Sequence, residues 1–208
     1  MSLPKGGIFK MEKEIQPADI EQHPLKPVIP QHARLLMLGS FPPARSRWSM
    51  DFFYPNFQND MWRIYGLCFF DDKDYFVDVE RKAFRKELLE VFLTEKGVAL
   101  YDTASAVIRT KGTAADKDLE VVTPTDLDAL LRQMPECQAV VVTGQKAADV
   151  FTSHFQIAQP KVGTYTEFLF DGRPLRFYRM PSSSRAYPMK IERKAAFYLR
   201  MFQEIGLL

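Results

Sequence analysis

A short apolar run followed by a tight turn constrains the fold of this chain more than any other feature of its sequence. The run is residues 35–38 (LLML), and it ends at Gly39 and a Ser-Phe-Pro-Pro turn. Such a run is typical of a strand that lies in a parallel sheet and is covered on both faces. Because ligands bind just beyond the carboxyl ends of such strands, we expect the residues after Gly39 to line a site.

The turn leads into a segment rich in flat rings and amides. Its rings are Phe52, Phe53, Tyr54 and Phe57, and its amides are Asn56, Gln58 and Asn59. A base held on such a ring gains about 1–3 kcal/mol from stacking, and amides can then read its polar edge. A hydrophobic loop with turn-forming Asn and Pro residues accounts for the same composition equally well.

Beyond this stretch, short apolar runs alternate with amphipathic segments. This alternation indicates a three-layer α/β/α sandwich with a central, mostly parallel sheet. Residues 103–124 are small, charged or glycine and indicate an irregular excursion. We expect strands at residues 97–102, 139–143 and 175–180, the last in a hairpin with 168–170, and helices at residues 61–70, 80–95, 124–133, 144–155 and 190–205.

Length and composition favour one folded unit. The chain has 208 residues, of which 46% are hydrophobic, and this is ample for one core and short for two. Residues 1–32 are polar, contain several prolines and lack periodicity, so we expect an N-terminal leader that lies on the surface. Residues 33–208 should form a single domain, and we expect a monomer.

Several classes of protein are excluded by composition. Two cysteines, Cys68 and Cys137, are too few for a disulfide framework or a four-cysteine iron–sulfur cluster, and buried free thiols are expected. His23, His32 and His154 lack metal-ligand spacing, so surface or core histidines and no metal or other cofactor are expected. No apolar run of 18 residues and no signal peptide occur, which predicts a cytoplasmic protein without a membrane partner.

The net charge of +2 hides an uneven distribution. Residues 171–204 contain eight Lys or Arg residues against three Asp or Glu residues. Such a surplus suits the neutralisation of phosphates, although a solvated helix face explains it equally well.

Three further positions carry chemical groups at the expected ends of strands. Asp102 ends the strand 97–102 and would lie beside the loop after Gly39 if the two strands are parallel neighbours; an Asp there can also cap the following turn. Lys146 lies at the start of a helix whose N-terminal amides favour an anion. Residues 181–185 (PSSSR) offer three hydroxyls and free backbone amides that could hold phosphates.

Four segments, in order between residues 34 and 202, resemble the uracil-DNA glycosylase superfamily. GSFPP, the aromatic segment and Asn59-Asp60-Met61-Trp62 resemble its first motif, most closely in the hypoxanthine-DNA (deoxyinosine) glycosylase branch. MPSSS resembles the second motif of thymine and mismatch-specific uracil glycosylases. GVALYDTASAV resembles the strand that carries the base-reading residue, and AVVVTGQKAADVF resembles a strand, turn and helix of the hypoxanthine branch.

The resemblance implies a monofunctional DNA base-excision repair glycosylase that flips a deaminated base out of DNA, hypoxanthine before uracil. Gly39, Ser40 and Phe41 would line the base pocket, Phe53 or Tyr54 would stack on the base, and Asp102 would read its edge. Ser182, Ser183 and Ser184 would contact phosphates, Arg185, Ala186 or Tyr187 would enter the duplex, and Lys146 would serve the phosphate path.

One departure from the family pattern changes the expected catalytic residue. Mismatch-specific uracil glycosylases carry a water-orienting Asn where this chain has Phe41, and Pro43 replaces the usual second glycine. The resemblance then leaves Asn56 and Asn59 as the two candidates for positioning water. A catalytically silent binder of damaged DNA or nucleobases is the alternative.

Overall fold

The centre of the molecule is a five-stranded sheet in the order β5-β2-β8-β10-β9. The computed structural model describes residues 19–110 and 118–208. β2 (Leu35–Gly39) lies between β5 (Val98–Asp102) and β8 (Ala139–Thr143), and β10 (Arg173–Met180) follows β8, all four strands being parallel. β9 (Thr164–Phe170) is the antiparallel edge strand. The predicted, mostly parallel sheet is confirmed.

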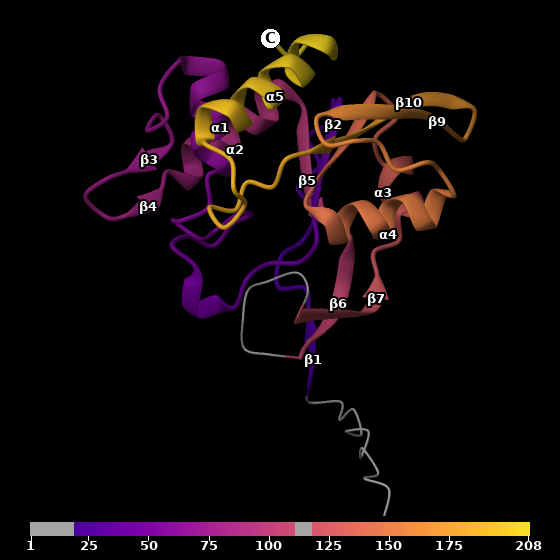
Figure 1. Cartoon of the computed structure of the whole chain (residues 1–208), viewed down its shortest axis with the longest axis horizontal. Helices are drawn as coiled ribbons and strands as arrows, with labels where there is room; N and C mark the ends of the chain where they lie inside the picture. Colours follow the sequence, from indigo (N-terminus) through magenta and orange to yellow (C-terminus); the bar gives the residue numbers. More distant parts are fainter. Residues whose placement is uncertain (1–18, 111–117) are drawn as a thin grey trace, which may run out of the picture.

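Helices cover both faces of this sheet (Figure 1). α1 (Met61–Phe70), α2 (Lys86–Lys96) and α5 (Ile191–Glu204) lie on one face, and α3 (Leu127–Arg132) and α4 (Gln145–Phe155) lie on the other. Leu35 and Met37 pack against the first group, whereas Leu36 and Leu38 pack against the second. Burial on both faces explains the uninterrupted apolar run and confirms the three-layer α/β/α fold.

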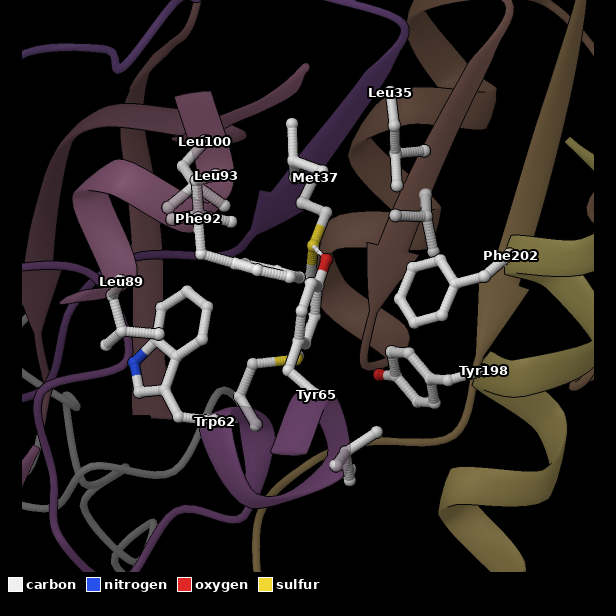
Figure 2. Close-up of a cluster of buried hydrophobic side chains, with 14 of the residues drawn as sticks. Leu35, Met37, Trp62, Tyr65, Leu89, Phe92, Leu93, Leu100, Tyr198 and Phe202 are labelled. Atoms are coloured by element: carbon white, nitrogen blue, oxygen red, sulfur yellow. Dashed lines mark hydrogen bonds between the residues drawn. The ribbon is translucent and has the colours of Figure 1, made fainter. Parts of the chain in front are cut away.

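The core beneath α1, α2 and α5 also holds two loops in place (Figure 2). Trp62 is fully buried, and its indole N–H donates to the Phe53 carbonyl at 3.0 Å. Tyr198 is likewise buried, and its hydroxyl donates to the Pro181 carbonyl at 3.0 Å. The polar ends of two core rings therefore anchor the loops that follow β2 and β10.

The helix predicted at residues 80–95 begins later than expected. α2 starts at Lys86, and the residues before it form β4 (Ala83–Phe84), which pairs with β3 (Val77–Asp78). Lys82 has a φ of 50°, a left-handed conformation that a continuous α-helix does not admit. The end of the helix was predicted correctly, because Gly97 closes it with a φ of 68°.

The prediction that residues 103–124 are irregular is wrong. β6 (Ala104–Arg109) and β7 (Leu119–Pro124) join β1 (Ile20–Gln22) in a second, antiparallel sheet of order β1-β6-β7. Bulges between Ala104 and Val107 interrupt the two-residue alternation that would have indicated a strand.

Residues 19–32 pack against the rest of the fold. β1 pairs with β6, and Val28 exchanges two backbone hydrogen bonds with Leu100. Residues 1–18, which belong to the predicted leader, lie outside the described residues, and the domain boundary at residue 32 stays a prediction. None of the helices that the structure describes is long and apolar enough to cross a membrane.

Candidate functional site

A pocket opens at the carboxyl ends of the parallel strands, where the residues after Gly39 were expected to line a site. Two loops, those after β2 and β10, enclose it together with the ends of β5 and β8. Its lining residues are Gly39, Ser40, Phe41, Pro42, Pro43, Phe53, Tyr54, Pro55, Asn56, Asn59, Asp102, Thr143, Ser182, Ser183 and Ser184. Of the predicted site residues, Lys146, Arg185 and Tyr187 do not line it.

Asp102 lies at the inner end of the pocket because β5 and β2 are parallel neighbours. Gly39 and Asp102 are register partners, which meets the condition under which the sequence placed Asp102 beside the loop after Gly39. A Cβ atom on Gly39 would lie 2.4 Å from Asp102 Oδ1, so only glycine allows this approach without displacing the carboxylate. The side chain is 8% exposed, and the pocket therefore contains a nearly buried acid.

His23 is the hydrogen-bond partner of this acid. Its Nε2 lies 2.9 Å from Asp102 Oδ2, and its side chain is 2% exposed. Of the two expected positions for this residue, surface or core, His23 occupies the core. Its hydrogen bond with Asp102 was not predicted. The two residues are 79 positions apart and meet because β1 pairs with β6, for which the sequence pattern carried no signal.

Aromatic rings form the walls of the pocket. The Phe41 ring meets the His23 ring edge-on at 5.2 Å, and Phe53 is 3% exposed. Tyr54 has a φ of 48°, its ring packs edge-on against Trp62 at 5.8 Å, and it also lines the pocket. These rings and the Asp102 carboxylate suit a planar ligand with a polar edge.

The amide oxygens of both candidate catalytic asparagines are bonded to backbone. Asn56 Oδ1 accepts from the Gln58 N–H at 3.0 Å, and Asn59 Oδ1 accepts from the Met61 N–H at 2.9 Å, at the start of α1. A backbone N–H can only face an amide oxygen, so these bonds fix the orientation of each side chain. These two bonds leave the amide NH₂ group of each residue, a donor, unused.

The serine loop, residues 181–187, lies against the start of α1. The Asp60 N–H donates to the Ser183 carbonyl at 3.0 Å, and Asn59 and Ser184 form an isolated antiparallel bridge. Ser182 Oγ accepts from the Ser184 N–H at 3.2 Å, and Ser184 Oγ accepts from the Ala186 N–H at 3.2 Å. These bonds order the loop and leave its hydroxyl hydrogens available as donors.

A buried lysine of α5 holds the serine loop in place. Lys194 is 0% exposed, and its ammonium donates to the Ser184 carbonyl at 2.8 Å and lies 3.6 Å from Asp60 Oδ2. Burial lowers the pKa of Lys194, while the Asp60 charge opposes this shift. Arg185 Nε lies 2.9 Å from Asp60 Oδ1. The prediction of a helix at residues 190–205 gave no sign that Lys194 would be buried.

The basic residues of the C-terminal part do not gather on one surface. Arg173 and Arg176 lie near the start of β10, at the opposite end of the sheet from the pocket, and Arg173 donates to the Pro135 carbonyl at 2.6 Å. Lys146, which precedes this part of the chain, is also turned to other use: it donates to the Leu119 carbonyl at 2.7 Å. Arg185, a residue of the serine loop, is exposed. Only part of the charge surplus can therefore serve the pocket.

Neither a metal cluster nor a reactive thiol accompanies the pocket in the described ranges. No group of three His, Cys, Asp or Glu residues that could hold a metal occurs in residues 19–110 and 118–208. Both cysteines are free, and burial raises the pKa of Cys68 to about 12 and that of Cys137 to about 11.

Comparison with known proteins supports the fold. No family model and no curated protein sequence matches the chain. Among solved structures it is similar to the solution NMR structure of a putative uracil DNA glycosylase from Methanosarcina acetivorans. The TM-score is 0.60 at 18% identity, and the match covers 90% of this chain and 99% of the other. The chain therefore has a three-layer α/β/α fold of the kind found in that protein.

Proposed function

We propose that this protein is a monofunctional DNA glycosylase that hydrolyses the N-glycosidic bond of a deaminated base flipped out of DNA, with hypoxanthine favoured over uracil. The observation that carries the proposal is a nearly buried carboxylate, Asp102, at the inner end of a ring-walled pocket between two ordered loops. The shared fold and the motif resemblance support the same assignment.

The pocket suits a base with a hydrogen on its ring nitrogen. An ionised carboxylate only accepts hydrogen bonds, so Asp102 would accept from N1–H of hypoxanthine or N3–H of uracil. Phe53 and Tyr54 would hold the faces of the base. A purine makes more contact with such walls than a pyrimidine, which favours hypoxanthine.

The serine loop would contact the DNA strand that carries the flipped nucleotide. The hydroxyls of Ser182, Ser183 and Ser184 would donate to phosphate oxygens, and Arg185 or Tyr187 would fill the vacated space in the duplex. Flipping costs a few kcal/mol and least at a mispaired base, so the filled gap would stabilise the open state.

Bond cleavage would pass through an oxocarbenium-like sugar, as in other glycosyl transfers. The oxygen of a water molecule bonds to C1′ while the base leaves with the electrons of the C1′–N bond and takes up a proton. The amide NH₂ groups of Asn56 and Asn59 would hold this water or stabilise the charge on the departing base. Lys194 and Lys146 do not line the pocket and their amines are bonded to backbone carbonyls, which favours hydrolysis over a Schiff-base lyase step.

A catalytically silent binder is the second candidate, and two observations favour it. Phe41 lines the pocket where the resemblance places a water-orienting Asn. The amide oxygens of both candidate asparagines each already accept one backbone hydrogen bond, which leaves each oxygen a single lone pair for a water proton.

A duplex panel separates the two candidates. End-labelled duplexes with deoxyinosine, deoxyuridine, a thymine mismatch or no lesion are incubated with the protein and treated with alkali to reveal abasic sites. Strand breaks at deoxyinosine above all other lesions are expected. Breaks mainly at deoxyuridine would overturn the hypoxanthine preference, and binding without breaks on any duplex would favour the silent binder.

Two variants that keep the backbone bonds test the asparagines. Asn56→Asp and Asn59→Asp retain the oxygen that accepts from the Gln58 or Met61 N–H but remove the amide donors. At least one should lose about 100-fold in base release, the loss typical of one transition-state donor, while melting temperature stays close to wild type. Gln58→Glu, an exposed neighbour outside the pocket lining, controls for added charge. Full activity in both Asp variants would remove the asparagines from the mechanism.

A further inference from the structure

The buried contact between His23 and Asp102 has no role in the reaction proposed above. His23 comes from the segment before the central sheet, and its backbone N–H donates to the Ser105 carbonyl of β6 at 2.8 Å. Its ring lies 4.7 Å from the Tyr101 ring, in addition to its contact with Phe41. Backbone and rings together hold the imidazole in one position, with Nε2 directed at the acid.

The surroundings of Nδ1 show which hydrogen bonds the ring can make. Nδ1 lies 3.1 Å from the Leu25 nitrogen and 2.8 Å from the Leu25 oxygen. A neutral ring that accepts from the Leu25 N–H carries its hydrogen on Nε2, and a protonated ring donates from Nδ1 to the Leu25 carbonyl and still carries a hydrogen on Nε2. The other neutral form, with its hydrogen on Nδ1, would place an Nε2 without a hydrogen against the carboxylate and so bring two acceptors together. In the first two forms Nε2–H donates to Asp102 Oδ2 and stabilises the carboxylate anion.

This arrangement leaves one carboxylate oxygen for the ligand. Oδ2 is occupied by His23, whereas Oδ1 lies beside Gly39, a pocket-lining residue. An ionised acid restricted in this way is an acceptor only. A protonated acid could instead donate to a ring nitrogen that lacks a hydrogen.

We propose that His23 is a positioning residue that sets base specificity, because it keeps Asp102 an ionised acceptor. Deamination converts the acceptor N1 of adenine into the N1–H donor of hypoxanthine, and the acceptor N3 of cytosine into the N3–H donor of uracil. The pair thus admits a deaminated base and rejects its parent, since a parent base would bring two acceptors together. Guanine also has an N1–H, so the pair does not exclude it. The inference rests on the proposed function of the pocket.

Binding of uncleavable probes tests the pair without relying on turnover. The probes are duplexes with 2′-fluoro-deoxyinosine or 2′-fluoro-deoxyadenosine opposite an abasic-site analogue, so that neither base is paired before flipping. Wild-type protein should prefer the inosine probe. His23→Leu should lower this preference by about 10- to 100-fold, the effect of losing a hydrogen bond to a charged group. His23→Gln, whose amide N–H can still donate to Asp102, should restore most of it.

Two further variants separate specificity from folding. In the double variant His23→Leu with Asp102→Ala, both polar partners are removed together, which limits the stability cost. If His23 acts through Asp102, the double variant and Asp102→Ala alone should show the same probe preference. His154→Leu, which removes a His–Asp contact on α4 outside the pocket, is the matched control and should behave as wild type.

The outcomes distinguish this inference from the proposed function. A folded His23→Leu protein with unchanged probe preference would overturn the inference, and so would equal weakening for both probes that His23→Gln does not rescue. Absence of base release by the wild type from every lesion duplex would refute the glycosylase, whereas the probe preference of a silent binder would still test the role of His23.

Discussion

Two carboxylates, Asp102 and Asp60, are buried close to the pocket to nearly the same extent, 6% and 7% exposed, but they face different surroundings. Asp102 lines the pocket, and its carboxylate is hydrogen-bonded to the imidazole of His23. Asp60 does not line the pocket and lies between two cations, Arg185 and Lys194.

The comparison shows that burial alone does not identify a functional acid. Asp60 joins the start of α1 to the serine loop, and its charge stabilises the contact between these two segments. Asp102 keeps Oδ1 beside Gly39 at the inner end of the pocket. We therefore expect substitution of Asp60 to act mainly on stability and substitution of Asp102 mainly on ligand recognition.

The largest effect is expected for Asp60→Ala. Removing one member of a buried charge cluster leaves Lys194 without its counter-charge, which costs about 3–5 kcal/mol of unfolding free energy. Urea unfolding followed by circular dichroism measures this loss. Stability within about 1 kcal/mol of wild type would show that Asp60 does not hold the serine loop in place.

Asp102→Ala should affect activity more than stability, the reverse of what is expected for Asp60→Ala. We expect base release from deoxyinosine to fall about 100- to 1,000-fold, as for loss of one preorganised contact to the reacting group. The unfolding free energy should change less than in Asp60→Ala, because the Asp102 carboxylate contacts one imidazole whereas Asp60 lies between the cations Arg185 and Lys194. Single-turnover kinetics and urea unfolding on the same preparation check both parts. Equal stability losses in the two variants would remove the contrast between the acids.

Gly39→Ala is a smaller perturbation of the pocket acid. The added Cβ would lie 2.4 Å from Asp102 Oδ1, so the carboxylate must move, at a cost of about 1–3 kcal/mol. We expect weaker binding of the inosine probe, with the fold retained. Gly172→Ala is the control for the loss of a glycine elsewhere, because no atom lies within 4 Å of a Cβ there, although its φ of 78° adds local strain. Unchanged probe binding in Gly39→Ala would show that the Oδ1 position does not matter.

Arg185→Ala should have the smallest effect on stability, because Arg185 is half exposed and Lys194 remains beside Asp60. If Arg185 contacts phosphate, the slope of log K against log salt for lesion DNA should fall by about 1. Arg176→Ala, at the opposite end of β10, should leave the slope unchanged. Equal slopes in wild type and Arg185→Ala would exclude the phosphate contact and leave insertion into the duplex as the proposed role.

Local patterns predicted the elements that position the pocket. The run at residues 35–38, Gly97 at the end of a helix and the turn at Gly144 each carry a short-range signal, and the parallel pairing of Gly39 with Asp102 follows from two such runs. The serine loop was also placed correctly, between β10 and α5.

Contacts between distant segments could not be predicted in this way. His23 reaches Asp102 through the β1–β6 pairing, and the small residues and bulges of β6 conceal the strand pattern. Lys194 can be buried because its ammonium contacts the Ser184 carbonyl and the Asp60 carboxylate. The spacing of residues along α5 cannot predict either contact. The resemblance implied that Lys146 serves the phosphate path; its ammonium is bonded to the Leu119 carbonyl, a contact that the sequence did not indicate, and its role stays a prediction.

Identification of the released product tests the central claim most directly. A deoxyinosine duplex is incubated with the wild-type protein, and the small molecules set free are separated and identified by mass spectrometry without alkali treatment. We expect free hypoxanthine in an amount equal to the abasic sites formed, with the DNA backbone intact. Release of a nucleotide, or strand cleavage with the base still attached to its sugar, would contradict hydrolysis of the N-glycosidic bond.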